Sequence, residues 1–288
     1  MCATCGCGSE HHDDHHHGDG PGNVHGHTHA HGELHDHDHA HGHAHGHDHE
    51  HAHAGAADEI SRTIRFERDL LAKNARLAAK NRSALAAARI AIFNLIGSPG
   101  AGKTALLEAT VRRLGTSMPL AVLEGDQATD NDAKRIERAG CRAIQINTGT
   151  GCHLDASMIE SGIRAIGAKR ESVVFVENVG NLVCPALFDL GELAKIVVMS
   201  VTEGEDKPVK YPHIFRAAEL FVLTKVDLQP LVKLDEARCI TFARRINPRI
   251  KVLRVSATTG EGVEAFCTWI RDEAPRAWRT DETQVVPS

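Results

Sequence analysis

The sequence predicts an α/β fold in which a mostly parallel central sheet is flanked by helices and preceded by a disordered, histidine-rich tract. Two observations lead to this prediction. From residue 90 onward, seven short apolar runs rich in β-branched residues alternate with helical stretches, which is typical of a parallel sheet covered on both faces. Before residue 59, the chain is dominated by His, Gly, Ala and Asp and has few large apolar residues.

The first 89 residues form three regions of different composition. Residues 1–9, MCATCGCGS, are a head rich in Cys and Gly. Residues 10–58 hold all of the 21 histidines except His153 and His213. They cannot bury enough apolar surface to offset the entropy of folding, which predicts disorder. Dense imidazoles suit nickel, zinc and copper, so we favour a native metal-binding tract over a purification tag. Residues 59–89 lack Gly and Pro and are predicted to be helical.

Composition excludes several classes of protein. The formal net charge of −5 gives no basic footprint for nucleic acid. No apolar run approaches the roughly 20 residues of a membrane span, and the N-terminus lacks the pattern of a secretory signal. The eight cysteines are therefore interpreted as reduced thiols or metal ligands, and the expected location is the cytoplasm.

The predicted sheet belongs to a domain over residues 90–280, followed by a tail at 281–288. Its seven strands are expected in the runs IAIFNLIG, PLAVLEGD, AIQINTG, SVVFVENVG, KIVVMSV, LFVLTKVD and KVLRVSA. Most of these runs lead through a loop motif into a helical stretch. Since ligands of open parallel sheets gather beyond the carboxyl ends of the strands, we expect the functional residues in these loops.

The segment GSPGAGKT carries a phosphate-binding signature. A strand, G-x-x-x-x-G-K-T and a helix follow one another in the order of a P-loop, which predicts a P-loop nucleoside triphosphatase. Its backbone N–H groups and the helix dipole attract phosphate oxygens. We expect Lys103 to reach the β- and γ-phosphates and Thr104 to bind Mg²⁺. The predicted phosphate loop comprises Gly97, Ser98, Pro99, Gly100, Ala101, Gly102, Lys103 and Thr104.

The segment TKVD at the end of LFVL predicts guanine as the base. The Asp227 carboxylate can accept hydrogen bonds from guanine N1–H and the 2-amino group, whereas adenine lacks both donors. Lys225 would lay its methylene stem over the base. Ser256 and Ala257 match a loop whose backbone N–H can meet guanine O6. Thr224 stands where Asn is usual, which places its tether to the phosphate loop in doubt.

The magnesium and switch residues are less standard. Asp126 in EGDQATDND is the expected carboxylate near Mg²⁺, with Thr104. Glu177 and Gly180 in ENVGN could sense the γ-phosphate, so the predicted catalytic residues are Lys103, Asp126 and Glu177. The simplest interpretation of Asp130 and Asp132 is that they are solvated acids of the loop. No Gln stands at an obvious water-positioning place, which predicts slow hydrolysis that depends on dimerisation or a partner.

Several long strings together resemble one family. They are the CxxCGC head, GSPGAGKT, GDQATDND, NTGTGCHLDASM, ENVGNLVCPALFDLGE, SVTEGEDKPVKYPHIF and TKVDL. With the histidine tract they resemble the hydrogenase nickel-incorporation GTPases, the HypB family of the SIMIBI class. The resemblance implies GTP and GDP as ligands and a homodimer that depends on nucleotide or metal. It also implies delivery of Ni²⁺ toward the large subunit of [NiFe]-hydrogenase, with a HypA-type maturation partner that binds zinc and nickel.

The same resemblance implies two metal sites. In the head, Cys2, Cys5 and Cys7 would bind Ni²⁺ with the N-terminal amine, whose identity depends on whether Met1 is retained. Within the domain, the family binds Zn²⁺ or Ni²⁺ at a dimer interface through residues that match Cys152, His153 and Cys184. A Cys and a His that are neighbours in the chain usually point in different directions, which is poor geometry for binding one ion. A ligand from the second subunit, or water, would complete the site. Cys141, Cys239 and Cys267 are interpreted as small buried hydrophobes.

Alternatives remain at three places. Leu228 and Val232 are either a dimer contact on one helical face or ordinary core residues. Cys152 and His153 could be a catalytic dyad, although their adjacency gives poor geometry for activating a nucleophile. The whole chain could be a nickel storage or buffering protein, or a GTPase that supplies another nickel enzyme such as urease.

Overall fold

The computed structural model describes residues 51–126, 131–149 and 151–278, with side chains from residue 61 onward. The chain divides into two compact units, Met1–Arg65 and Phe66–Ser288, and everything below about the site concerns the second. The Cys-rich head at 1–9, the histidine tract up to residue 50, and the tail at 281–288 lie outside the described residues. Their predicted roles in metal binding therefore stay predictions.

The seven predicted strands are confirmed, and they form one fully parallel sheet in the order β3-β2-β4-β1-β5-β6-β7. Strand β1 lies at the centre, so the loop that follows it opens where the chain order reverses, the place where ligands bind in such sheets. Their bounds are β1 (Ile90–Gly97), β2 (Leu120–Asp126), β3 (Arg142–Asn147), β4 (Ser172–Glu177), β5 (Ala194–Ser200), β6 (Leu220–Thr224) and β7 (Lys251–Val255).

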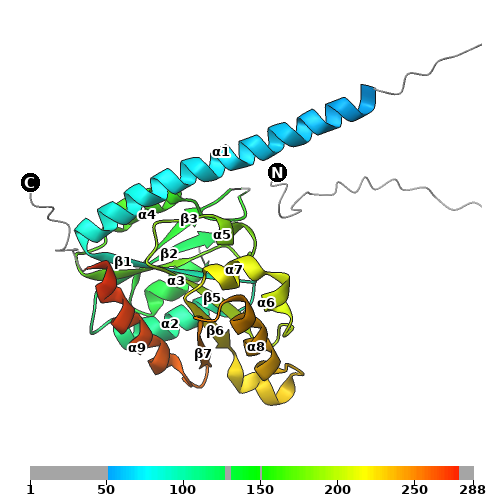
Figure 1. Ribbon diagram of the computed structural model, residues 1–288. Helices are drawn as coiled ribbons and strands as arrows, with labels where there is room; N and C mark the ends of the chain where they lie inside the picture. The colour runs from blue at the N-terminus through cyan, green and yellow to red at the C-terminus, as the bar shows by residue number, and fades with distance from the viewer. Residues whose placement is uncertain (1–50, 127–130, 150, 279–288) are drawn as a thin grey trace, which may run out of the picture. The chain divides into compact units, whose positions relative to one another are not determined.

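Helices cover both faces of the sheet (Figure 1). The apolar runs make this necessary, because side chains on both faces of a central strand such as β1 are buried. One face carries α2 (Lys103–Leu114), α3 (Asn131–Arg138) and α9 (Val263–Glu273). The other face carries α4 (Ala156–Ile166), α7 (Pro212–Ala217) and α8 (Glu236–Ile246).

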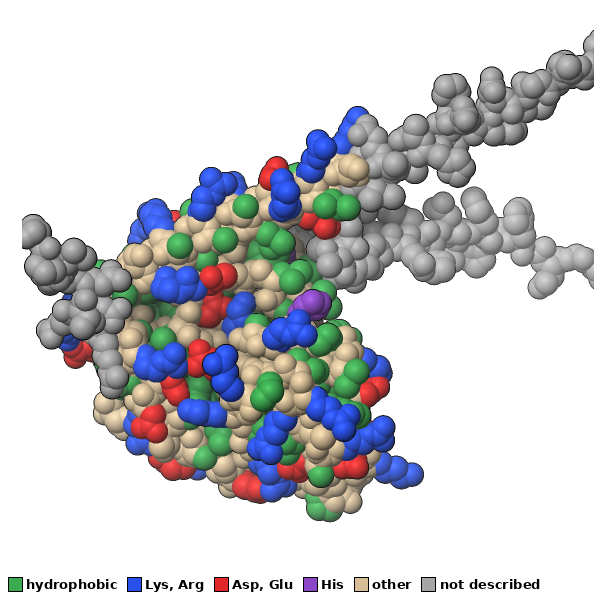
Figure 2. Space-filling view, viewed as in Figure 1, with side chains coloured by type: hydrophobic (Ala, Val, Ile, Leu, Met, Phe, Trp, Pro, Cys, Tyr) green, Lys and Arg blue, Asp and Glu red, His purple; other side chains and the backbone are tan. Residues whose placement is uncertain are grey.

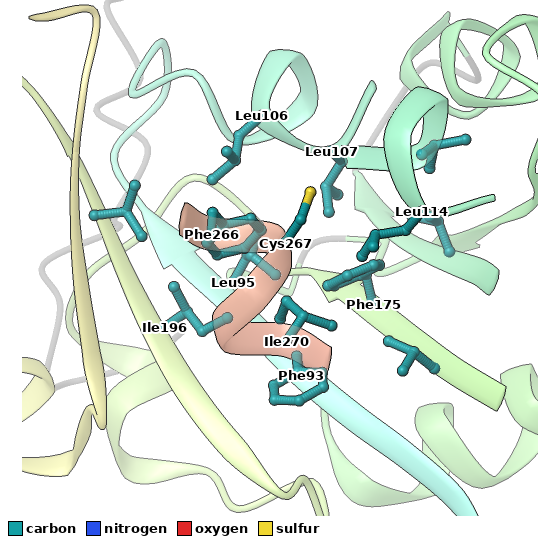
Figure 3. Close-up of a cluster of buried hydrophobic side chains, with 14 of the residues drawn as sticks. Phe93, Leu95, Leu106, Leu107, Leu114, Phe175, Ile196, Phe266, Cys267 and Ile270 are labelled. Carbon is teal, nitrogen blue, oxygen red and sulfur yellow. The ribbon is translucent and has the colours of Figure 1, made fainter. Parts of the chain in front are cut away.

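The larger core lies between the sheet and α2 and α9 (Figure 3). Phe93 is its centre, with ring centroids 6.1 Å from Phe175 and 5.5 Å from Trp269. The cysteines outside the predicted metal sites are buried thiols in these cores, as predicted, and burial raises their pKa values. They are Cys141, Cys239 and Cys267.

Short helical turns complete the fold: α5 (Cys184–Leu187), α6 (Lys207–Lys210), and the 3₁₀ turns η1 (Val226–Leu231) and η2 (Ala274–Ala277). Turn η1 settles part of one open question. Pro230 lies inside it, and the segment is a 3₁₀ turn instead of the α-helical face that the spacing predicted. Leu228 and Val232 both pack partly buried against the core under α7 and α8, whereas Leu231 is exposed.

Helix α1 (His51–Ala88) begins eight residues before the predicted start at residue 59. Four alanines at 52, 54, 56 and 57 explain the extension, because Ala has the highest helix propensity. Lys and Arg side chains project from the outer surface of α1 (Figure 2), while Leu85 is buried against the sheet core under α4. No helix among the described residues is long and apolar enough to cross a membrane.

The fit of α1 against the domain predicts an intolerant glycine. Gly191 has φ +85°, and a Cβ there would lie 2.8 Å from the carbonyl oxygen of Ala78 in α1. Gly191→Ala combines backbone strain with a clash against backbone and is expected to lower the free energy of unfolding by about 2–3 kcal/mol. Gly140→Ala is the matched control, since Gly140 has φ +101° but open space around its Cβ position. Urea denaturation measures both variants, and equal losses would contradict the close approach.

Candidate nucleotide and metal sites

The phosphate loop runs from the end of β1 into α2 and has the expected geometry. Gly100 and Gly102 have φ values of 73° and 90°, a region in which a Cβ is strained. The Ala101 N–H donates to the Ser98 carbonyl at 3.1 Å and closes the turn. The glycines therefore permit the tight curve that turns backbone N–H groups toward a phosphate.

Lys103 and Thr104 converge on one carboxylate. The Lys103 ammonium donates to the Gly97 and Ser98 carbonyls at 3.3 and 3.4 Å and lies 4.0 Å from Glu177 Oε1. The Thr104 hydroxyl donates to the same Glu177 oxygen at 2.9 Å. The structure thus brings together the predicted catalytic Lys103 and Glu177. It adds Lys207 of α6, whose ammonium donates to Ser98 Oγ at 2.5 Å.

The predicted base-reading residues line one cavity of about 230 Å³ beside the phosphate loop. Lys225 and Asp227 lie on its wall with Thr224, Ala257 and Gly102. Ser256 is fully buried and accepts from the Thr259 N–H at 3.1 Å, so it shapes this loop from behind. A cavity lined by a lysine stem and a carboxylate is suited to a flat base with ring N–H donors.

The tether to the phosphate loop is present despite the Asn-to-Thr departure. The Thr224 hydroxyl donates to the Ala101 carbonyl at 2.5 Å, with the Met199 carbonyl as a second acceptor at 3.2 Å. A buried hydroxyl can therefore join the base-reading loop and the phosphate loop in place of an amide.

Three acids gather behind the phosphate loop. Glu124 of β2 pairs directly with Glu177 of β4 in the sheet register. Carboxylate oxygens of these two residues and of Asp132 lie within 4.8 Å of one another. Glu124 Oε2 and Glu177 Oε2 are buried without a hydrogen-bond partner. Buried, unsatisfied carboxylate oxygens next to the Thr104 hydroxyl fit a magnesium ion, which prefers oxygen ligands. Asp126, the predicted ligand, lies two residues beyond Glu124 and outside this cluster.

Burial dominates the electrostatics of this carboxyl pair. Desolvation, and then the Glu177 carboxyl, raise the pKa of Glu124 to about 11. Desolvation also raises the pKa of Glu177, against the opposing effects of Lys103 and Thr104. The physical reason is that two carboxylates in one apolar site cannot both remain charged without strong compensation. The pair therefore retains a proton, and we place that proton on Glu124.

The three residues predicted as internal metal ligands, Cys152, His153 and Cys184, lie together in a second cluster. Cys152 Sγ lies 3.1 Å from Cys184 Sγ and 3.6 Å from His153 Nδ1. The ring centroids of His153 and Phe188 are 3.9 Å apart. Burial lowers the pKa of His153, which favours the neutral imidazole that metals require. Two thiols and an imidazole suit zinc or nickel.

Asn178 connects the two clusters. It directly follows Glu177, and its Oδ1 accepts from the backbone N–H of Leu154, which directly follows His153, at 3.2 Å. Its amide group donates to Asn94 Oδ1 of the central strand at 3.2 Å. The nucleotide-side carboxylate and the metal loop are therefore joined through one buried side chain.

The loop that follows β4 also approaches the phosphate loop. A Cβ on Gly180 would lie 2.7 Å from Pro99, so only glycine allows this contact without a shift. Farther along, Asn181 Oδ1 accepts from the Val183 N–H at 2.8 Å and holds the turn that leads to Cys184.

Comparison with known proteins decides the family. Residues 91–254 match the model of the CobW/HypB/UreG nucleotide-binding domain. The chain is 53% identical over 210 residues to the hydrogenase maturation factor HypB of Azotobacter vinelandii, covering 73% of this chain and 69% of that protein. For the Escherichia coli K12 HypB, identity is 52% over 212 residues, with 74% and 73% covered.

The chain belongs to the HypB family of hydrogenase maturation factors.

Solved HypB structures share the fold. The Archaeoglobus fulgidus HypB is 40% identical, with a TM-score of 0.66 over 70% of this chain and 99% of that one. A Helicobacter pylori HypB in complex with nickel is 32% identical, with a TM-score of 0.68 over 73% and 99%. Family membership establishes a nucleotide-binding P-loop protein of the SIMIBI class with a role in hydrogenase maturation.

Sequence reasoning missed several residues of this HypB-type site. Glu124 was visible as a carboxylate inside an apolar strand, and Asn94 as an amide in the middle of IAIFNLIG, but neither matches a motif. Lys207 and Asn178 stood within strings that carry the family resemblance without a role of their own. Among the predicted ligands, Cys2, Cys5 and Cys7 fall outside the described residues.

The buried carboxyl predicts an unusual dependence of stability on pH. The folded state raises the pKa of Glu124 from an ordinary value near 4.5 to about 11. Its stabilising contribution is full below pH 4.5 and is lost as pH rises toward 11. The test compares wild type with Glu124→Gln, both free of nucleotide and metal. Between roughly pH 6 and 9, the free energy of unfolding should fall with pH more steeply in wild type, by up to about 1 kcal/mol per pH unit. Urea denaturation measures the slopes, and parallel slopes would contradict a protonated Glu124.

Proposed function

We propose that this chain is a Mg²⁺-dependent GTPase that couples its nucleotide state to the handling of Ni²⁺ for hydrogenase maturation. The observation that carries the proposal is the Asn178 side chain. It bonds to the loop of His153 while its own backbone continues directly from Glu177. The remaining contacts support a nucleotide on one side of this connection and a metal ion on the other.

GTP is the proposed nucleotide. The phosphate loop and Lys103 would hold the phosphates, and the 230 Å³ cavity would hold the base. Asp227 favours guanine over adenine, because its carboxylate needs ring N–H and amino donors. Thr224 supports this assignment, since its hydrogen bond to the Ala101 carbonyl joins the base-reading loop to the phosphate loop.

Mg²⁺ would be held by oxygen ligands at the acidic cluster. Thr104 and Glu177 supply a hydroxyl and a carboxylate already in contact, and Asp126 remains the proposed additional carboxylate. When bound, the ion would neutralise charge that develops on the phosphates during hydrolysis. The Oε2 atom of Glu177 is buried without a hydrogen-bond partner. The position of this carboxylate would therefore depend on the ion and on which nucleotide is bound.

Ni²⁺ is the proposed cargo of the Cys152, His153 and Cys184 cluster, and Zn²⁺ suits the same donors. Three donors leave a four-coordinate ion one ligand short, which water or a second subunit would supply in a homodimer. A nickel-bound HypB from Helicobacter pylori shares this fold. The Cys-rich head and histidine tract would provide further nickel capacity, and a HypA-type protein would be the cytoplasmic partner for transfer to the hydrogenase large subunit.

Coupling between the two sites requires different metal affinities in the two nucleotide states. If GTP and GDP place Glu177 differently, Asn178 moves with it and shifts the Leu154 end of the metal loop. By linkage, metal must then bias the binding of GTP relative to GDP by the same factor. The contact at Gly180 and Pro99 provides a second path from the phosphate loop to the turn before Cys184.

A nickel titration of GTP turnover tests this function. In wild type, Ni²⁺ should inhibit GTP turnover, because metal bound at the cluster shifts the protein between its nucleotide states. Cys184→Ala removes a ligand and should turn over GTP with little response to Ni²⁺. The matched control is Cys239→Ala, which removes a buried thiol of α8 outside the cluster, and this variant should respond to Ni²⁺ as wild type does. Equal inhibition of all three proteins, or no inhibition of any, would contradict the proposed coupling.

A further inference from the structure

Helix α1 contributes two buried amides to the loops of the Cys/His cluster. Asn74 and Asn81 lie seven residues apart, so they share one face of the helix, and each is about 95% buried. Buried amides persist in proteins only where their hydrogen bonds are satisfied. Their partners are backbone groups of Ala156, Asp189 and Leu190, just beyond the two segments that carry the Cys/His cluster.

Asn74 joins one loop to the other. Its Oδ1 accepts from the Ala156 N–H at 2.9 Å, three residues beyond His153. Its Nδ2 donates to the Asp189 carbonyl at 2.7 Å, one residue beyond Phe188, whose ring faces the imidazole of His153. A single side chain thus fixes the separation between the segment of Cys152 and His153 and the segment that follows Cys184.

Asn81 repeats this arrangement two helical turns later. Its Nδ2 donates to the Ala156 carbonyl at 2.7 Å and to the Leu190 carbonyl at 3.2 Å. Gly191 allows the approach, since any side chain there would meet the backbone of α1. Around the same place, the exposed ion pair of Arg82 and Asp189 adds little, because solvent screens it.

These contacts close into a buried ring. The Leu190 N–H donates to Glu192 Oε2 at 2.6 Å, and Glu192 Oε1 accepts from Asn94 Nδ2 at 3.3 Å. Asn94 Oδ1 accepts from Asn178, whose own Oδ1 holds Leu154 in the metal loop. The ring therefore runs from α1 through both segments of the Cys/His cluster and returns through Asn178.

We propose that Asn74 and Asn81 are positioning residues of the internal metal site, so that its affinity for metal depends on the placement of helix α1. Neither side chain reaches a ligand atom. They act by setting the distance between two loops whose ligands must meet at one ion. The inference rests on the proposed function only in taking Cys152, His153 and Cys184 as a metal site.

Co²⁺ binding to the full-length chain tests this inference. Cys2→Ser, Cys5→Ser and Cys7→Ser in the parent protein remove the thiols of the head. The thiolate-to-cobalt charge-transfer absorption then reports the internal site, because histidines do not produce it and the other three cysteines are buried in the cores. A chelator buffer fixes the free Co²⁺ concentration, so ions held by the histidine tract do not distort the titration.

Asn74→Leu and Asn81→Leu in this parent should each weaken Co²⁺ binding about tenfold, the lower range for residues that support metal ligands. Binding of a fluorescent GDP should be unchanged. The matched control is Leu85→Ala, which removes buried apolar contact from the same helix and leaves both amides in place. It should lower the melting temperature and retain the Co²⁺ affinity of the parent. If Asn74→Leu does not fold, Asn74→Asp takes its place in the test. The aspartate keeps an acceptor for the Ala156 N–H and loses the donor to the Asp189 carbonyl.

Each result decides something different. Unchanged Co²⁺ affinity in the asparagine variants, or an equal loss in Leu85→Ala, would overturn the positioning role and leave the proposed function standing. Absence of the charge-transfer absorption from the parent would overturn the internal metal site itself, and the inference with it. Weaker Co²⁺ binding with unchanged GDP binding in the asparagine variants alone supports the inference.

Discussion

The end of strand β4 is the constraint on which both sites depend. Glu177 and Asn178 are consecutive, yet the carboxylate of the first meets Thr104 of the phosphate loop and the amide of the second meets the metal loop. Because β4 lies between β2 and the central β1, it cannot shift without disturbing both neighbours. The proposed nucleotide and metal sites therefore share one short piece of backbone.

This arrangement requires polar groups inside an apolar sheet. Asn94, Glu124 and Glu177 lie on central strands, where burial of an unsatisfied amide or charge costs several kcal/mol. The structure meets this cost in two ways. Asn94 is bonded on both sides, to Asn178 and to Glu192. Burial raises the pKa values of Glu124 and Glu177, which favours a proton on the pair, and the Lys103 ammonium lies 4.0 Å from Glu177.

The sequence contained the elements of the fold and the motif residues of the site. Apolar runs predicted the seven strands to within one or two residues at most ends. Of the motif residues, Lys103 and Thr104 begin α2, and Asp227 lines the 230 Å³ cavity beside the phosphate loop. Each of these features is local, because a strand, a turn and a helix start follow from neighbouring residues.

The features that the sequence did not reveal are non-local. Glu124 meets Glu177 only because β2 and β4 are neighbours in that register, and strand order cannot be derived from apolar runs. Composition predicted the helix that carries Asn74 and Asn81, but it gave these two residues no role. Their role depends on which loops their face of the helix contacts. The tether at Thr224 stayed in doubt for a related reason, since the acceptor within reach of its hydroxyl lies 123 residues earlier in the chain.

The central claim is that metal affinity at the internal cluster differs between the two nucleotide states. The most direct measurement is a Co²⁺ titration with buffered free metal, followed by thiolate-to-cobalt absorption. It uses the full-length protein carrying Cys2→Ser, Cys5→Ser and Cys7→Ser, with Mg²⁺ and either GDP or a non-hydrolysable GTP analogue. The account predicts affinities that differ by roughly fivefold to a hundredfold, and a difference that disappears in Asn178→Ala. Equal affinities in the two nucleotide states, with both nucleotides shown to be bound, would contradict it.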